Sequence, residues 1–178
     1  LVLDVTSSSY PEKPVVPFIK ATQDRVVLEI QRGCIRGRRF CQAGMLYRPT
    51  RERDLEMLKK AAYAMLKNTG YEEISLSSLS SSDYQKLPEL IDFLIEECSR
   101  RKVNISLPSL RIDAFSLDVM NKVQDVKKSS LTFAPEAGSQ RLRNVINKGL
   151  TEEVILHGAK LAFEGGWTRV KLYFMLGI

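Results

Sequence analysis

The chain has 178 residues, of which 44% are hydrophobic and 27% charged, a composition that supports one packed domain and excludes intrinsic disorder. No apolar run approaches the ~20 residues that span a bilayer, and the start from Leu1 to Asp4 lacks the features of a signal peptide. With a net charge of +6 and three unevenly spaced cysteines, we expect a soluble cytoplasmic protein rather than a disulfide-stabilised secreted domain.

The first segment differs in composition from the rest. Residues 1–24 contain three consecutive serines and Pro11, Pro14 and Pro17, which favour an extended linker over a packed element. We expect 1–24 to be a linker from an N-terminal domain that this chain lacks. We expect residues 25–178 to be the core domain, truncated at its C-terminus because the chain stops directly after a strand-like run.

Beyond residue 25, short apolar runs alternate with amphipathic segments. The predicted strands are 25–31, 73–79, 103–110, 130–133 and 168–175, and the predicted helices are 51–67, 82–101, 116–123, 139–147 and 151–164. Thr50, Ser139 and Thr151 are the expected caps, and Gly70 is the expected end of the first long helix. Alternating strands and helices predict an α/β fold with parallel strands, either an open doubly wound sheet or a barrel.

Directly after the first strand, a loop from Gln31 to Gly44 holds Cys34 and Cys41, two of the three cysteines. Taken alone, these residues are also compatible with packed thiols or a disulfide. Zinc is disfavoured, because a structural zinc site usually has four ligands and the chain offers one histidine, His157.

This loop resembles the cluster loop of radical S-adenosylmethionine (SAM) enzymes, C-x3-C-x-aromatic-C. Cys34, Phe40 and Cys41 match the motif, and Arg38 stands where the middle cysteine is expected. In that family the three thiolates hold a 4Fe-4S cluster whose fourth iron binds the amino and carboxylate groups of SAM. The nearest resemblance is to uncharacterised enzymes that fuse this domain to a degenerate cobalamin-binding-like domain. It implies a TIM-barrel-like fold, a partial (β/α)6 barrel with the first five β/α units present.

The resemblance extends to the loops that follow the later strands, where α/β proteins gather their chemistry. Ser78 lies in a polar segment that meets the SAM amino group in the family, although a serine-rich helix cap is an alternative. Arg111 is placed to clamp the SAM carboxylate, with a salt bridge to Asp113 as the alternative. Glu136 matches the acidic residue of an E-x-G-S segment, or else favours a helix dipole. Gly177 matches a glycine near the adenine.

The resemblance implies a fragment of a radical SAM enzyme that cleaves SAM to a 5'-deoxyadenosyl radical. Cys34 and Cys41 would bind iron and Phe40 would lie by the adenine, with upstream and downstream domains completing the protein. Because a guanidinium stays cationic and repels metal, Arg38 predicts an unstable cluster and little radical activity. Cys98 shares an apolar helical stripe and is expected to be a core thiol rather than a replacement ligand.

Two other functions remain open at this point. The basic run between Arg32 and Arg53 favours, as an alternative, an RNA-binding or RNA-modification module without radical chemistry. A noncatalytic α/β interaction domain is the other possibility. The sequence does not identify a substrate.

Overall fold

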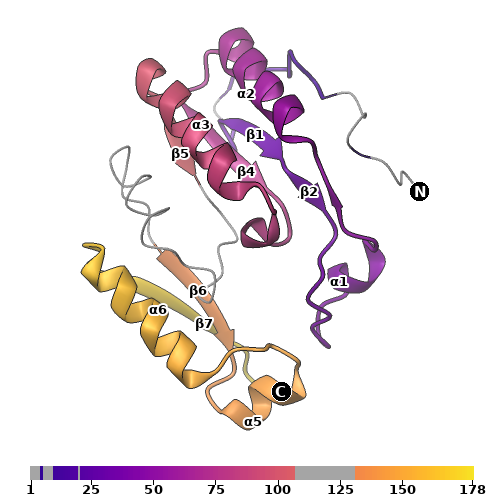
Figure 1. The fold of residues 1–178 in the computed structure, drawn as a ribbon, viewed down its shortest axis with the longest axis vertical. Helices are drawn as coiled ribbons and strands as arrows, with labels where there is room; N and C mark the ends of the chain where they lie inside the picture. Colours follow the sequence, from indigo (N-terminus) through magenta and orange to yellow (C-terminus); the bar gives the residue numbers. More distant parts are fainter. Residues whose placement is uncertain (1–4, 6–9, 20, 107–130) are drawn as a thin grey trace.

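The computed structural model describes residues 5, 10–19, 21–106 and 131–178 (Figure 1). One parallel sheet has the strand order β1-β4-β5, with β1 at Val26–Glu29, β4 at Glu73–Ser77 and β5 at Asn104–Ser106. A second parallel pair joins β6 (Leu131–Glu136) to β7 (Val170–Phe174), and a short antiparallel hairpin joins β2 (Gln31–Arg32) to β3 (Arg51–Glu52). The predicted α/β class with parallel strands is confirmed.

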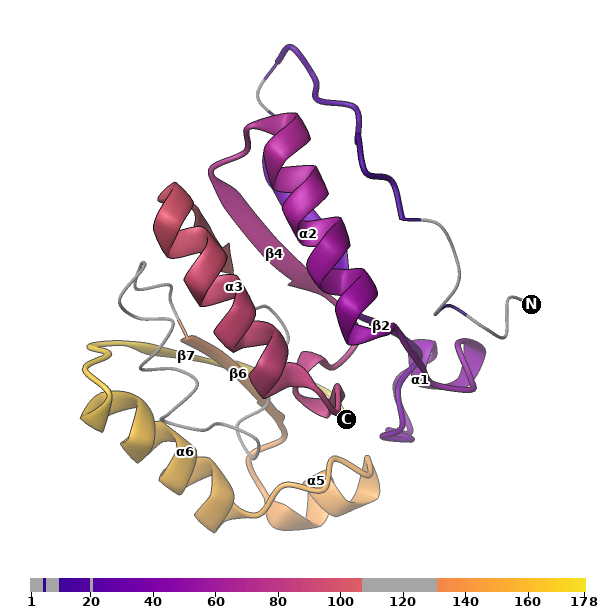
Figure 2. The same cartoon turned by 45° about the horizontal axis from the view of Figure 1, so that its top comes forward.

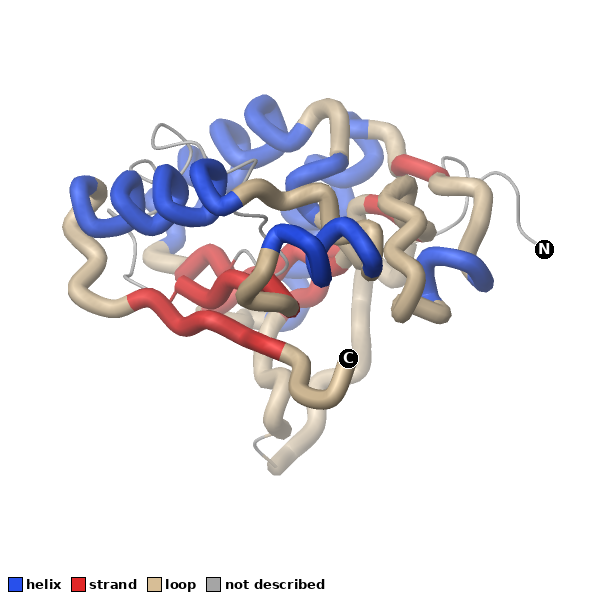
Figure 3. The backbone as a smooth tube through the Cα atoms, turned by 90° about the horizontal axis from the view of Figure 1, so that it is seen from below, coloured by secondary structure: helices blue, strands red, loops and turns tan. Residues whose placement is uncertain are grey.

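The helices among the described residues are α1 (Ala43–Leu46), α2 (Leu55–Thr69), the 3-10 turn η1 (Ser81–Asp83), α3 (Leu87–Arg101), α5 (Gln140–Val145) and α6 (Glu152–Glu164). Figure 2 shows α2 and α3 side by side over the first sheet, with α6 beside β6 and β7. Seen from below in Figure 3, the long helices form a layer on one side of the strands. The predicted helix 116–123 and the candidate site residue Arg111 lie outside the described residues.

Alternation along the strands separates the core from the opposite face. In β1, Val26 and Leu28 are 1% and 0% exposed and pack toward α2 and α3, whereas Val27 is 43% exposed. Since successive strand residues point to opposite faces, Glu29 emerges on the same face as Val27. The sheet therefore buries an apolar face under the helices, and Val27 and Glu29 lie on its opposite face.

A second apolar cluster stabilises the β6-β7 pair. Leu131 and Phe133 of β6 pack with Leu150, Ala162 and Trp167, which lie on or beside α6. Apolar burial of this kind contributes about 25 cal/mol for each Å² removed from water. Within the described part of the chain, none of the helices is both long and apolar enough to cross a lipid bilayer.

The observed helix ends confirm some of the predicted caps and contradict others. Ser139 and Thr151 cap α5 and α6 by accepting hydrogen bonds from the backbone of Leu142 and Val154, and Gly70 ends α2 with a φ of 70°. These three predictions are confirmed.

The prediction that Thr50 caps the first long helix is wrong. Asp54 is the cap, because its carboxylate accepts from the backbone N–H groups of Glu56 (3.0 Å) and Met57 (3.1 Å). Residues 51 and 52 pair with β2 and so cannot be helical. The next helix, α3, likewise begins at Leu87 rather than near residue 82, since residues 81–83 form η1.

Candidate functional site

A cavity of about 590 Å³ opens where β1 and β4 end. It is lined by Glu29, Gln31, Arg32, Gly33, Tyr47, Arg51, Ser77, Ser78 and Leu79. These residues come from the carboxyl ends of two adjacent parallel strands, from the β2-β3 hairpin and from the loop that follows β2. Ligand sites of α/β proteins collect at this end of the strands.

The loop after β2 is shaped by a glycine that no other residue can replace without strain. Gly33 has a φ of 91°, and an added Cβ would lie 2.5 Å from the carbonyl oxygen of Tyr47 and 2.9 Å from the Cα of Thr50. This close approach folds residues 33–44, here called the cluster loop, back over the segment that leads to β3.

Contacts with two other parts of the fold hold the cluster loop. The guanidinium of Arg36 forms a bidentate ion pair with Asp83 of η1, with Nε 2.9 Å from Oδ2. On the other side, the Arg39 N–H donates to the carbonyl of Ile146 (3.1 Å) and the Asn147 side-chain amide donates to the carbonyl of Gly37 (2.9 Å). The loop therefore joins the first sheet to the turn after α5.

The structure places the two loop cysteines differently. Cys34 is buried, with 7% of its surface exposed, whereas Cys41 is partly exposed, and neither is in a disulfide. Phe40, the predicted neighbour of the adenine, is 42% exposed. Their roles as iron ligands and adenine contact stay predictions.

Cys34 lies on a second cavity of about 350 Å³ on the other side of the hairpin. Its lining also includes Gln31, Ile35, Thr50, Glu52, Asp83 and Gln85. Gln31 is 2% exposed, donates to the Ser80 carbonyl (2.5 Å) and keeps an unpaired side-chain oxygen among the described residues. It lines both cavities and therefore forms part of the wall between them.

The donor set does not fit a cluster held by three thiolates. Among the described residues no group of three or more His, Cys, Asp or Glu side chains is arranged to hold a metal ion. At the third ligand position, Arg38 offers a guanidinium whose buried Nε has no hydrogen-bond partner in the described structure. Cys98 does not replace the third thiolate, because it lies in the core at 0% exposure and burial raises its pKa to about 11.

Ser78 lies at the cavity, as the resemblance implies. Its hydroxyl accepts from the Ser80 N–H (3.2 Å) and shares a hydrogen bond with the Ser81 hydroxyl (3.0 Å). Ser78 does not cap α3, because α3 begins after Lys86 and has no side-chain cap; its hydroxyl lies instead at the start of η1, where Ser80 is the N-cap residue. Its contact with SAM stays a prediction.

Glu136 ends β6 in a conformation that few non-glycine residues adopt, with a φ of 69°. Its carboxylate accepts from the Lys148 ammonium at 3.2 Å, and the Lys148 side chain is only 6% exposed. The nearby buried guanidinium of Arg143 instead donates to the carbonyls of Ala137, Gly138 and Leu150. Glu136 is thus held rigidly, but it is not among the residues that line either cavity beside the hairpin.

Gly177 lies just after β7, with a φ of 77° and open space where a Cβ would stand. It is likewise absent from the lining of the two cavities. The structure brings Ser78 and the start of the cluster loop together, whereas Glu136 lies at the end of β6 and Gly177 lies beyond the end of β7.

Sequence reasoning missed a charged network at the end of β1. Glu29 accepts from Arg32 (2.8 and 3.0 Å) and from Arg53 (2.6 Å). Arg53 stacks on the Tyr10 ring, 4.8 Å from its centroid, and the Tyr10 hydroxyl accepts from the Glu29 N–H and donates to the Val27 carbonyl (3.3 Å). The sequence signal for this network was an acidic residue, Glu29, in an otherwise apolar strand. Its partners could not be predicted in the same way, because they lie up to 24 residues away in the chain.

The pKa values of this network follow from its contacts. Burial alone would raise the pKa of Glu29, but the hydrogen bonds from Arg32 and Arg53 outweigh it and hold that pKa below its ordinary value. Burial raises the pKa of Tyr10, so its hydroxyl keeps the proton that it donates to Val27.

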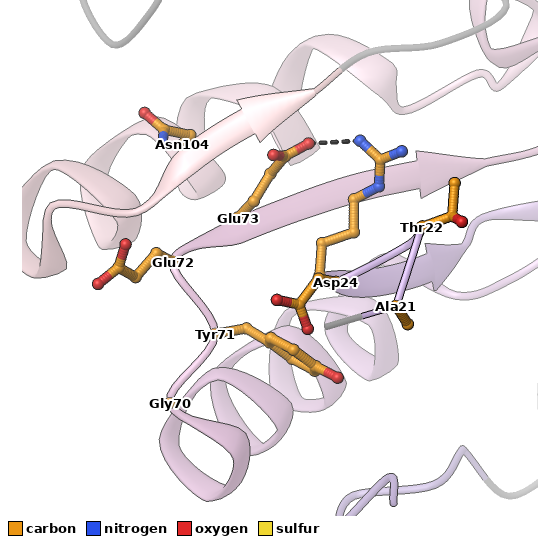
Figure 4. Close-up of a pocket in the computed structure, with 9 residues that line it drawn as sticks. Ala21, Thr22, Asp24, Gly70, Tyr71, Glu72, Glu73 and Asn104 are labelled. Atoms are coloured by element: carbon orange, nitrogen blue, oxygen red, sulfur yellow. Dashed lines mark hydrogen bonds and ion pairs between the residues drawn. The ribbon is translucent and has the colours of Figure 1, made fainter. Parts of the chain in front are cut away.

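Another cavity, of about 560 Å³, lies at the opposite end of the first sheet (Figure 4). Its lining includes Asp24, Tyr71, Glu72 and Asn104, and Glu73 forms an ion pair there with Arg25. These residues surround the amino ends of β1, β4 and β5, the edge where α/β folds support stability rather than chemistry. We therefore centre the candidate site on the hairpin.

Comparison with known proteins identifies the family of this chain. Residues 28–178 match the radical SAM superfamily. The chain is 38% identical over 184 aligned positions to the uncharacterised protein MJ0966 of Methanocaldococcus jannaschii, covering 98% of this chain and 40% of that protein. The chain thus spans less than half the length of this relative.

Two solved structures share the fold. The cobalamin-dependent SAM radical enzyme OxsB, with aqua-cobalamin and SAM bound, superimposes with a TM-score of 0.65 at 18% identity, over 85% of this chain and 24% of that enzyme. Methylornithine synthase (PylB) superimposes with a TM-score of 0.56 at 13% identity, over 86% of this chain and 45% of the synthase. The predicted α/β fold with parallel strands matches the fold of these neighbours, and the chain belongs to the radical SAM superfamily.

Proposed function

We propose that this chain is the core of a radical SAM enzyme that binds SAM in the 590 Å³ cavity and whose iron-sulfur cluster is impaired by Arg38. The observation that carries the proposal is the meeting of Ser77 and Ser78 with Gly33, the first residue of the cluster loop, in the cavity at the carboxyl ends of β1 and β4. The family implies SAM and an iron-sulfur cluster, and we propose the 4Fe-4S type for this chain.

The residues at the site support SAM binding and cluster binding to different degrees. Serine hydroxyls at the end of β4 can accept hydrogen bonds from the ammonium group of SAM. Cys34 and Cys41 supply two soft thiolate ligands, but Arg38 cannot supply the third. We therefore derive no radical step for the chain with Arg38, and expect SAM binding to survive where radical chemistry does not.

The wider context is part of the proposal. We propose a cytoplasmic enzyme in which residues 1–24 link the core domain to an upstream domain and a further segment follows residue 178. The relative's greater length supports this arrangement. The match to the radical SAM superfamily does not favour the RNA-binding alternative.

The test is to restore the missing ligand. The full chain, its Arg38→Cys variant and an Arg39→Cys control are reconstituted anaerobically with iron and sulfide, and the iron content and visible absorption are measured. We expect the Arg38→Cys variant to retain a cluster and the other two proteins to lose most of their iron on desalting. The control matters because it adds a thiol one residue away, outside the C-x3-C spacing. Equal iron in all three proteins would contradict the proposal.

A further inference from the structure

The β2-β3 hairpin presents two chemically different faces. Arg32 lies directly opposite Arg51, and Gln31 lies directly opposite Glu52. Neighbouring residues of a strand point to opposite faces, so the two arginines leave the hairpin together on one side. They line the 590 Å³ cavity, whereas Glu52 lines the 350 Å³ cavity on the other side.

The charge lining these cavities differs in sign. Directly opposed side chains on an antiparallel pair have Cβ atoms about 5 Å apart, and like charges in that position are destabilising. The 590 Å³ cavity is lined by Arg32, Arg51 and a single carboxylate, Glu29, which is shared with Arg53. By contrast, in the part of the chain that the structure describes, no Lys or Arg lines the cavity on the Glu52 face. Among the described residues, the lining of the arginine face thus carries two guanidinium groups and one carboxylate.

Both guanidinium groups are held before any ligand arrives. The Arg51 Nε donates to the Pro49 carbonyl (3.0 Å), and Arg32 is held by both oxygens of Glu29. Glu29 is in turn held by Arg53, whose side chain is only 4% exposed and which also donates to the Val5 carbonyl (3.0 Å). Preorganised arginines lose less side-chain entropy on binding, and their planar forks suit carboxylate and phosphate groups.

We propose that Arg32 and Arg51 bind an anionic group, a carboxylate or a phosphate, of the substrate. The cavity volume lies within the range of small-molecule sites, and the serine hydroxyls of residues 77 and 78 line the same space. The inference rests on the proposed function, since it assigns the substrate class of the same site. It explains why a small hairpin places two arginines directly opposite each other at the cavity.

The experiment measures binding of two probes to the full chain by calorimetry at low salt, namely succinate for a carboxylate and inorganic pyrophosphate for a phosphate. The variants are Arg51→Gln and a matched control, Arg141→Gln, which removes one positive charge from α5. We expect Arg51→Gln to weaken the binding of at least one probe by about tenfold or more, because the variant loses charge-assisted hydrogen bonds to the anion. The affinity of Arg141→Gln for each probe should stay within about twofold of that of the parent chain, because solvent and salt screen a distant charge. Whichever probe responds identifies the anion.

Three results would overturn the inference: no binding of either probe, an unchanged affinity in Arg51→Gln, or equal losses in both variants. A parallel titration with SAM separates the sources of the anion. If Arg51→Gln weakens SAM alone, the pair serves the cofactor carboxylate and the substrate assignment fails. If the parent chain binds a probe but not SAM, the proposed function fails while the anion site stands. Should Arg51→Gln not fold, Arg51→Lys decides, because it keeps the charge but loses the fork, and unchanged affinity there would refute the inference.

Discussion

At the scale of single residues, Glu29 is the acidic centre of the site. It is the carboxylate on the cavity side of β1, and two guanidinium groups and the Tyr10 hydroxyl set its position. Replacing it would leave the Arg53 guanidinium buried without its carboxylate. This loss lowers the free energy of unfolding by more than the intact ion pair adds to it. Glu29 therefore couples the folded state to pH.

The folded-state pKa of Glu29 lies below its ordinary value of 4.5, so its charged form stabilises the fold above that pH. As the pH falls from about 4.5 through the folded-state pKa, this contribution disappears. We expect the difference in free energy of unfolding between the parent chain and Glu29→Gln to shrink between pH 6 and pH 3, as measured by urea denaturation. Parallel curves for the two proteins over that range would show that Glu29 does not titrate as proposed. Glu12→Gln, an exposed acidic side chain, serves as the control.

At the scale of elements, the hairpin decides where the first long helix begins. Residues 51–52 pair with β2 and are therefore extended, so a helix cannot begin at Thr50. Asp54 is the next residue able to cap, and its carboxylate meets two backbone N–H groups of the first turn. The hairpin and the cap together aim Arg51 into the cavity while α2 covers the core.

This assignment predicts a clear difference between two alanine variants. Asp54→Ala should lower the free energy of unfolding by about 1 kcal/mol, the usual value of an N-cap. Thr50→Ala should change it by no more than about 0.5 kcal/mol, since Thr50 caps nothing. Urea denaturation of both variants checks this, and a larger loss from Thr50→Ala would restore the original prediction.

At the scale of the whole molecule, the cluster loop joins the two parallel groups of strands. Its hydrogen bonds to Ile146 and from Asn147 cross more than 100 positions of sequence, and Arg36 ties the same loop to η1. Asn147 is itself in a left-handed conformation, with a φ of 55°. The turn after α5 therefore positions the loop that carries both candidate iron ligands.

Removing this contact should loosen the loop without unfolding the protein. Asn147→Gly keeps the left-handed backbone accessible but deletes the amide that donates to Gly37. We expect the Arg39 amide hydrogen to exchange roughly fivefold faster, because one net hydrogen bond contributes about 1 kcal/mol. Lys102→Gly, at another left-handed residue at the end of α3, should leave this amide unchanged. Hydrogen exchange followed by mass spectrometry measures both, and equal effects would argue against the contact.

Local patterns in the sequence determined much of this protein. The alternation of apolar strands with amphipathic helices indicated the parallel α/β class, and Gly70, Ser139 and Thr151 marked helix ends because capping depends on nearest neighbours. The loop from Gln31 to Gly44 pointed to the family through the local spacing of Cys34, Phe40 and Cys41, and the family match over residues 28–178 confirms that assignment.

Only the tertiary structure decided which distant residues complete the site. Tyr10, Glu29 and Arg53 meet across up to 43 positions, and Glu136 pairs with Lys148 rather than with the buried Arg143. The hydrophobic periodicity of the sequence does not predict such partners. Strand register and loop closure bring these groups together, and their spacing in the chain follows no pattern. The opposed pair of Arg32 and Arg51 exists only because the hairpin folds residue 51 back onto residue 32.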